Sequence, residues 1–180
     1  MRHIILTVII STLFACNSSP RPNSNAVETS ELTDTTSTEP EQPERIESPT
    51  ELNPEIAVGF INSYVENANK MREAVEIREW VNSSELVTDN FKTELVNMIN
   101  EAFEREPDYG LGFDPILDAQ DYPEEGFLLS NYDSTLNIAT VTGKQWTSFV
   151  LNIKLTNQND RTLVDGCGVV NIPEEQRAER

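Results

Sequence analysis

Closely spaced acidic side chains are the groups most suited to chemistry in this sequence. Asp114, Asp118 and Asp121 follow one another at intervals of four and three residues, with Glu124 and Glu125 just beyond. If Asp114 caps a short helical turn, the three aspartates share one face of it. A hard cation such as Ca²⁺ takes about six to eight oxygen ligands, so this loop is a candidate cation site. The favoured interpretation is that Asp114 and Asp118 cap the loop and accept its own hydrogen bonds.

Asp165 is a second candidate, because in an extended strand it shares a face with Leu163 and Cys167. A carboxylate in an apolar pocket has a raised pKa and can transfer protons. Asp165 together with Tyr64 or Tyr132 would therefore suit a small lyase or isomerase. The favoured interpretation places Asp165 at a β-bulge, where its side chain accepts backbone hydrogen bonds.

One histidine and two cysteines limit the possible active sites. His3 lies in a segment that we expect to be removed, so the mature protein would contain no imidazole. Serine or cysteine catalysis that depends on histidine, and zinc bound by histidine, are thereby excluded. Cys16 and Cys167 would form no disulfide, because lipidation would consume Cys16. We expect Cys167 to be a small buried residue, and we expect no cofactor.

Cys16 follows a segment typical of an export signal. The first three residues are a short basic start, and residues 4–14 form an apolar run that is too short to cross a bilayer as a helix. The sequence Leu13-Phe14-Ala15-Cys16 resembles the bacterial lipobox. This resemblance implies cleavage between Ala15 and Cys16, a diacylglyceryl thioether on Cys16 and stable anchoring in a membrane. The alternative is an ordinary signal peptide in which Cys16 is incidental.

The segment after the anchor predicts a tether. Residues 16–53 are rich in Ser, Thr, Pro and Glu and contain no aromatic residue. So little apolar surface cannot offset the entropy of ordering a backbone, so we expect disorder. Asn17 follows Cys16 instead of an aspartate that would resemble an inner-membrane retention signal. The sequence therefore favours a bacterial cell envelope location, at the outer membrane facing the periplasm if the bacterium is Gram-negative.

Three helices are expected at the start of a folded domain over residues 54–173. Asn53-Pro54-Glu55 supply an N-cap, a proline and an acid, and a broad apolar stripe follows up to residue 68. A shorter helix is expected over residues 71–81. Thr88 caps a third helix that ends at residues 104–107. The expected buried face of this third helix consists of Phe91, Leu95, Met98, Ile99, Ala102 and Phe103. The favoured interpretation is that this face belongs to the core, and the alternative is that its Met and aromatic members line a ligand pocket.

Four strands are expected after the helices, over residues 126–132, 135–142, 147–155 and 161–170. The third alternates cleanly, with Phe149, Leu151, Ile153 and Leu155 on one side. Residues 174–180 are expected to form a disordered tail. Helices followed by antiparallel strands predict an α+β domain in which the helices pack on one face of a curved sheet.

One stretch between the helices and the strands resembles a known type of domain. It runs Gly112-Phe113-Asp114-Pro115-Ile116-Leu117-Asp118-Ala119-Gln120-Asp121-Tyr122-Pro123. It resembles the signature of an uncharacterised family of bacterial lipoprotein domains, and the closing residues 163–173 are similar to that family's last strand. The family in turn resembles the cystatin-like cone of nuclear transport factor two-like proteins. The resemblance implies a fold and carries no activity with it.

The sequence favours a non-enzymatic, lipid-anchored module that binds a protein, a peptide or a small ligand. Its formal net charge of -18 repels phosphate backbones, so nucleic acid is not an expected partner. The expected membrane contact is the Cys16 lipid. The alternatives are the small enzyme that uses Asp165 and the module that binds a divalent cation.

Overall fold

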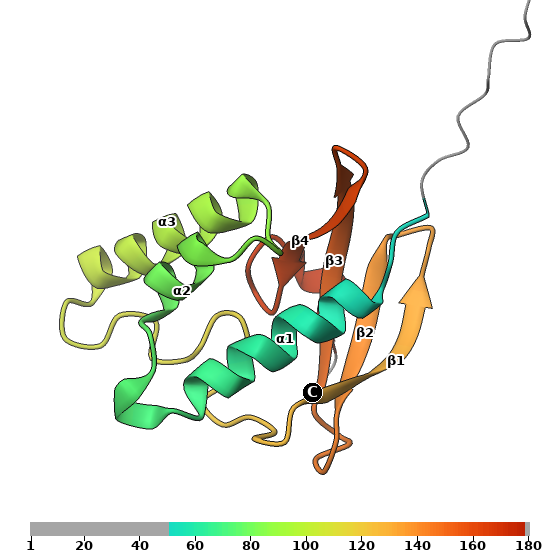
Figure 1. The fold of residues 1–180 in the computed structure, drawn as a ribbon. Coiled ribbons are helices and arrows are strands. Elements are labelled where there is room, and N and C mark those ends of the chain that lie inside the picture. Colours follow the sequence, from blue (N-terminus) through green and yellow to red (C-terminus); the bar gives the residue numbers. More distant parts are fainter. Residues whose placement is uncertain (1–50, 179–180) are drawn as a thin grey trace, which may run out of the picture. The chain divides into compact units, whose positions relative to one another are not determined.

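A computed structural model describes residues 51–178 of the chain. In this part, three α-helices precede a four-stranded antiparallel sheet, which confirms the predicted α+β class (Figure 1). Ala15, Cys16, the expected signal peptide and most of the expected tether lie outside the described residues. Within residues 51–178, no helix is both long enough and apolar enough to cross a membrane.

The first helix, α1 (Glu55–Ala68), begins where the sequence predicts. The Asn53 side chain accepts a hydrogen bond from the Glu55 N–H at 3.0 Å, which satisfies one free donor of the first turn. The predicted apolar stripe is buried, including Phe60, Ile61 and Tyr64. In Figure 1, α1 crosses the sheet obliquely and is the helix that packs on all four strands.

The helix predicted over residues 71–81 is wrong in its first half. Met71–Glu73 form one 3₁₀ turn, and α2 (Ile77–Ser83) starts only after Glu76, whose side chain accepts from the Arg78 N–H. The Asn67 side chain explains the break, because it bonds both the N–H and the C=O of Val75 at 3.0 and 2.8 Å. Those two bonds favour an extended backbone over another helical turn.

The third helix, α3 (Asp89–Arg105), matches its prediction closely. The Thr88 hydroxyl accepts from the Phe91 N–H at 3.0 Å, which makes Thr88 the N-cap. Phe91, Leu95 and Ile99 are buried, as expected for its apolar face. Phe103 was expected in the core but is 47% exposed.

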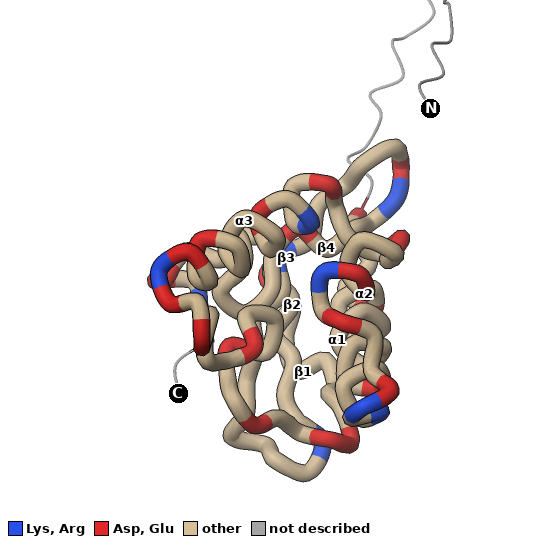
Figure 2. The backbone as a smooth tube through the Cα atoms, turned by 90° about the vertical axis from the view of Figure 1, so that its left-hand side faces the viewer, with Lys and Arg blue, Asp and Glu red and all other residues tan. Residues whose placement is uncertain are grey.

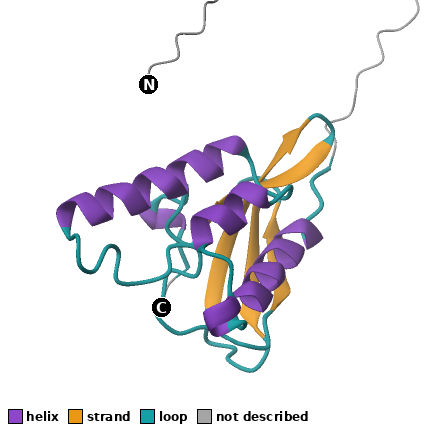
Figure 3. Ribbon diagram, turned by 60° about the vertical axis from the view of Figure 1, so that its left-hand side comes forward, coloured by secondary structure: helices purple, strands orange, loops and turns teal. Residues whose placement is uncertain are grey.

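The strands form a simple meander in the order β1-β2-β3-β4. They are the orange ribbons in Figure 3, where helices are purple. Turn chemistry fixes the register: Asp133 accepts from two N–H groups of the first hairpin turn, and Asn159 and Asp160 have positive φ in the last. The predicted alternation of the third strand is confirmed, because its four expected core residues are buried. The strands are β1 (Phe127–Asp133), β2 (Ile138–Gly143), β3 (Val150–Gln158) and β4 (Arg161–Cys167).

Both edges of the sheet have partners outside it. Beside β4, the Thr88 N–H bonds the Val164 carbonyl and the Val164 N–H bonds the Leu86 carbonyl, so a short parallel bridge covers this edge. Beside β1, the Asn62 side chain of α1 bonds both the N–H and the C=O of Phe127, as a neighbouring strand would. The register of β1 also shifts between Leu129 and Asn131, which marks a bulge.

The ends of the domain differ from the prediction. Leu52, expected in the tether, is buried in the core. Glu174–Gln176, expected in a disordered tail, form a 3₁₀ turn. The Asn152 side chain of β3 donates to the Gln176 carbonyl at 2.8 Å, so this turn packs on the sheet. The order of both segments comes from tertiary contacts that a local pattern does not reveal.

Candidate functional site

A groove lined mainly by apolar and aromatic side chains lies between the helices and the loop that follows α3. It encloses about 410 Å³. Pockets of this kind, mostly apolar with a few convergent polar groups, are the usual form of a binding site. We call it the aromatic groove, and its lining residues are Tyr64, Glu76, Ile77, Ile99, Phe103, Tyr109, Leu111, Gly112, Phe113, Asp114 and Pro115.

Three aromatic side chains of this groove are exposed. Phe103 is 47% exposed, Tyr109 78% and Phe113 36%. A Cβ added to Gly110 would lie 2.9 Å from the Phe103 ring, so the ring rests directly on the Gly110 backbone. Gly110 also has a positive φ of 57°, which a larger residue rarely adopts. Phe103 is therefore held in position although nearly half of it faces solvent.

Two of the lining residues, Tyr64 and Asp114, form a hydrogen-bonded pair of polar side chains. The Tyr64 hydroxyl of α1 donates a hydrogen bond to Oδ2 of Asp114. The other oxygen, Oδ1, accepts from the N–H groups of Ile116 and Leu117 at 2.9 and 3.0 Å. Both carboxylate oxygens of Asp114 thus have partners. The favoured interpretation of Asp114 as a loop cap is confirmed, and the pair also fastens the loop to α1.

Burial shifts the acidity of this pair. It raises the pKa of Tyr64 above its ordinary value of 10.0, and the neighbouring Asp114 charge and hydrogen bond act in the same direction. Burial also raises the pKa of Asp114 above 3.8, although the Tyr64 hydroxyl and the two peptide N–H groups oppose this shift. Both shifts favour the neutral forms of the two side chains.

The loop that begins at Asp114 is closed on itself and pinned to the end of the sheet. Asp114 and Ala119 bond each other through their backbones, and the Val169 N–H donates to the Pro115 carbonyl at 3.0 Å. A Cβ at Gly168 would lie 2.4 Å from the carbonyl oxygens of both Pro115 and Ile116. Only glycine allows this close approach. The loop that forms this wall of the groove is therefore fastened to the end of the sheet.

The three aspartates of the candidate cation site do not converge. Asp114 points to Tyr64, Asp118 has a positive φ of 51° that ends the turn, and Asp121 is exposed. The turn is too short to keep a helical face over seven residues. Within residues 51–178, no group of three or more His, Cys, Asp or Glu side chains is arranged to hold a metal ion.

Asp165 lies at the bulge that the sequence favoured. The pairing of β3 with β4 shifts its register between Lys154 and Leu155, opposite Asp165. Its carboxylate accepts from the Thr88 hydroxyl at 2.8 Å and from the Asn90 amide at 3.5 Å, and it lies 3.4 Å from the Lys154 ammonium. These donors are side chains instead of the backbone groups expected. Asp165 thus supports the cap of α3.

The tyrosines proposed for the enzyme are not beside Asp165. Tyr64 bonds Asp114, and Tyr132 lies on β1, at the opposite edge of the sheet from β4. Three strand spacings of about 4.8 Å separate those two strands. Cys167 is buried as expected, and its thiol donates to the Ile116 carbonyl at 3.3 Å. The structure therefore does not assemble the predicted acid–tyrosine site.

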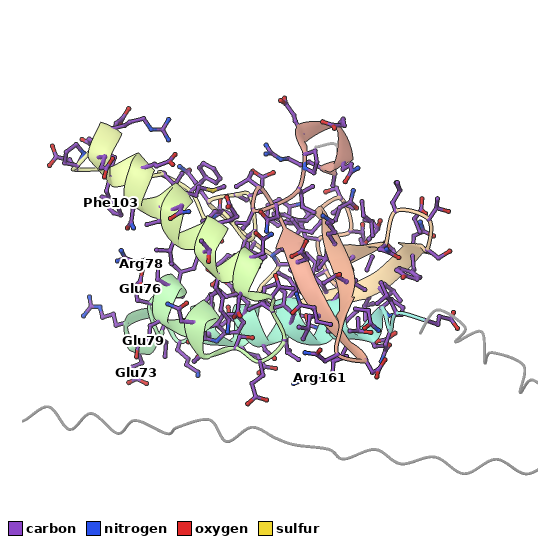
Figure 4. All side chains as sticks on the ribbon, turned by 90° about the horizontal axis from the view of Figure 1, so that it is seen from above. Glu73, Glu76, Arg78, Glu79, Phe103 and Arg161 are labelled. Carbon is purple, nitrogen blue, oxygen red and sulfur yellow. The ribbon has the colours of Figure 1, made fainter. Side chains whose placement is uncertain are left out.

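Charged side chains in the two segments that flank the groove are mostly acidic. The flanking segments 72–79 and 101–108 contain seven carboxylates and three arginines, a net charge of -4. One of these arginines, Arg78, is paired with Glu76 at 2.9 Å. Figure 4 shows Glu73, Glu76, Arg78, Glu79 and Phe103 on the same side of the fold. Acidic residues also outnumber basic ones along the described backbone as a whole in Figure 2.

The sequence interpretation missed two of the three exposed aromatics of the groove. It gave no role to Tyr109 or Phe113, and for Phe103 it favoured the core over a place in a ligand pocket. A usable signal was present, because Tyr109 and Phe113 flank Gly110 and Gly112 in a loop. Aromatic residues next to glycines in a connection have no regular element in which to be buried.

Comparison of the chain with protein-family models, with curated proteins and with solved structures found no match. The resemblance to a bacterial lipoprotein domain and to the cystatin-like cone therefore remains a prediction from the sequence.

Proposed function

We propose that this protein is a lipid-anchored, non-enzymatic binding module of a bacterial cell envelope. Its aromatic groove binds a segment of a partner protein whose apolar side chains are flanked by lysine or arginine. The Cys16 lipid holds the domain at the membrane through the tether. The observation that carries the proposal is the exposure of Phe103, Tyr109 and Phe113 around one hollow.

The chemistry of the lining supports an apolar occupant. Large exposed apolar side chains gathered in one place are uncommon on proteins that do not bind a partner there. Aromatic residues are enriched at the centres of protein interfaces, because they bury much area with few rotatable bonds. The rigid position of Phe103 on Gly110 reduces the entropy that binding would cost.

The charge of the rim supports basic flanking residues. The segments on both sides of the groove carry a net charge of -4, and the whole chain carries -18. Complementary charge accelerates association and excludes acidic competitors. Phe103 also lines a second hollow of about 570 Å³ with Arg78, Asn100 and Glu104, so an extended segment can continue past it.

A peptide titration tests this proposal. The purified lipidated protein is placed in nanodiscs of phosphatidylcholine, and empty nanodiscs serve as the blank. The probe is a short fluorescent peptide in which leucine and phenylalanine are flanked by lysines; the matched peptide has glutamates in their place. We expect saturable binding of the basic peptide only, measured by fluorescence anisotropy.

Substitutions locate the binding site. Phe103→Ser and Phe113→Ser should each weaken binding of the basic peptide about tenfold or more, because each removes an aromatic anchor. Leu128→Ser is the matched control, since Leu128 is 57% exposed on β1 and does not line the groove. Equal affinity in all three variants, or tighter binding of the acidic peptide, would reject the proposal. Circular dichroism checks that each variant is folded.

A further inference from the structure

Another hollow, which we call the Trp146 hollow, lies beside Trp146 and shares no lining residue with the aromatic groove. It encloses about 470 Å³. Trp146 is 45% exposed. The lining consists of Ala119, Gln120, Asp121, Trp146, Ser148 and Phe149. We infer that this hollow binds the guanidinium group of an arginine side chain from a partner protein.

The indole ring of Trp146 packs against the ring of Phe149. Its centroid lies 5.1 Å from that of Phe149, in an edge-to-face contact. Phe149 is buried and packs in the same manner on Phe127 in the core, with centroids 5.8 Å apart. The Phe149 N–H also donates to the Trp146 carbonyl at 2.9 Å. Trp146 is therefore an ordered wall of the hollow.

The polar groups of the hollow suit a cation with several donors. Asp121 supplies a carboxylate, and Ser148 supplies a hydroxyl oxygen. The Gln120 side chain donates its Nε2 to the Gly112 carbonyl at 2.9 Å, which fixes the amide and leaves Oε1 as an acceptor. Carboxylate, amide oxygen and hydroxyl can all accept hydrogen bonds, and the carboxylate repels anions.

A guanidinium group matches this set better than an ammonium group. It is planar, stacks on aromatic rings and presents parallel N–H donors that fit a carboxylate. Tryptophan is the aromatic side chain that attracts cations most strongly. The nearest basic residue along the chain, Lys144, places its ammonium beside Gly126, which is not part of the lining. The net charge of -18 also favours a basic partner.

This inference goes beyond the proposed function and can fail independently of it. The aromatic groove binds apolar side chains, whereas the Trp146 hollow selects a particular charged group. The lysine-flanked peptide used for the groove contains no arginine, so its binding does not test the hollow. Conversely, the probe used below has no apolar segment for the groove.

Tryptophan fluorescence provides the measurement. The chain contains only Trp80 and Trp146, so Trp80→Phe in the full lipidated protein leaves Trp146 as the sole indole. The probe is arginine amide, and citrulline amide is its uncharged analogue of nearly the same shape. We expect a saturable change in Trp146 emission with arginine amide, a weaker response to lysine amide and none to citrulline amide.

Charge substitutions decide the result. Asp121→Asn should raise the apparent Kd for arginine amide at least about tenfold, because it removes the carboxylate partner. Glu124→Gln is the matched control and should leave the Kd unchanged, since Glu124 is exposed and does not line the hollow. A non-saturable response, an unchanged Kd in Asp121→Asn, or an equal response to citrulline amide or to a neutral sugar would overturn the inference.

A second measurement covers the case in which Trp80→Phe does not fold. Trp80 packs on Phe60 and Tyr64, so its loss could disturb the core. The two indole N–H signals of the unsubstituted protein are then followed by NMR, with Trp146→Phe used to assign them. Arginine amide should shift only the Trp146 signal, and a shift of the Trp80 signal alone would contradict the inference.

Discussion

The pairing of Tyr64 with Asp114 shows how a reactive-looking carboxylate can be structural. Both carboxylate oxygens accept hydrogen bonds, one from the phenol and one from two peptide N–H groups. A general base needs an oxygen that can reach a substrate proton. Here, the pair joins α1 to the loop that forms one wall of the aromatic groove. In the proposed function, the pair would position that wall.

The raised pKa of Asp114 predicts a pH dependence of stability. The folded protein holds this proton more tightly than the unfolded chain does. The stabilisation is therefore fully present below the ordinary pKa of 3.8 and is lost as the pH rises through the raised pKa. Asp114→Asn has no such proton to lose. The free energy of unfolding of the natural protein, relative to that of Asp114→Asn, should fall as the pH rises from acid to neutral.

Urea unfolding of both proteins over a series of pH values checks this prediction. The other carboxylates are common to the two chains, so their contributions cancel in the difference. A difference that stays constant with pH, or that increases toward neutrality, would contradict the assigned direction of the Asp114 shift.

Sequence reasoning succeeded for residues whose role depends on near neighbours. Asp114 was correctly predicted as a loop cap, because its Oδ1 accepts hydrogen bonds from the N–H groups two and three residues later. Its pairing with Tyr64 was missed, since the two residues are 50 positions apart. The bond between Asp165 and Thr88 was missed for the same reason, because the two residues are 77 positions apart. The enzyme hypothesis had instead paired Asp165 with a tyrosine.

At the scale of elements, the start of α3 depends on a chain of three groups. Asp165 accepts from the Thr88 hydroxyl, and that hydroxyl oxygen accepts from the Phe91 N–H. Thr88 is 1% exposed, so its hydroxyl has no solvent to replace a lost partner. The carboxylate also lies near the N-terminus of α3, where negative charge is favourable. β4 and α3 are thereby linked.

A double-mutant cycle tests this link. Thr88→Ala should lower the free energy of unfolding by about 1–2 kcal/mol, the typical cost of a lost N-cap. With Asp165→Ala as the second substitution, the coupling energy should be about 0.5 kcal/mol or more, measured by urea unfolding. Additive effects would show that the two side chains act separately. Thr93→Ala, at an exposed position of α3, is the control and should change stability by less than about 0.5 kcal/mol.

Helices and strands that carry a clear cap or a clear apolar pattern in their own sequence were predicted well. Segments whose conformation depends on contacts with distant residues were not. Thr88 and the apolar face of α3 sufficed to place that helix, and alternation sufficed for β3. The segment 71–76 has helical composition, but the Asn67 side chain holds Val75 in an extended backbone. The strands β1 and β2 were shifted by one to three residues, because turn residues were counted as strand.

At the scale of the whole molecule, the proposed function depends on the anchor at Cys16, outside the described residues. Labelling of growing cells with radioactive palmitate should mark the natural protein and should fail for Cys16→Ala, because the thioether and the acylated amine both form at Cys16. Cell fractionation should show the variant leaving the membrane fraction.

The second cysteine provides the control for this experiment. Cys167 is buried in the described domain, so Cys167→Ala should keep the label. Label that persists in Cys16→Ala would mean that the acyl chains lie elsewhere, and the anchor proposal would then be wrong.

The contacts at the two edges of the sheet bear on pairing between copies of the protein that lie close together. Lipid anchors would confine many copies to one surface, where their encounters become far more frequent than in dilute solution. Open strand edges in such a crowd would pair with one another and form fibrous aggregates. The bridge beside Val164 and the Asn62 amide at Phe127 occupy backbone groups on the two outer strands. These contacts reduce the number of open backbone groups through which neighbouring copies could pair.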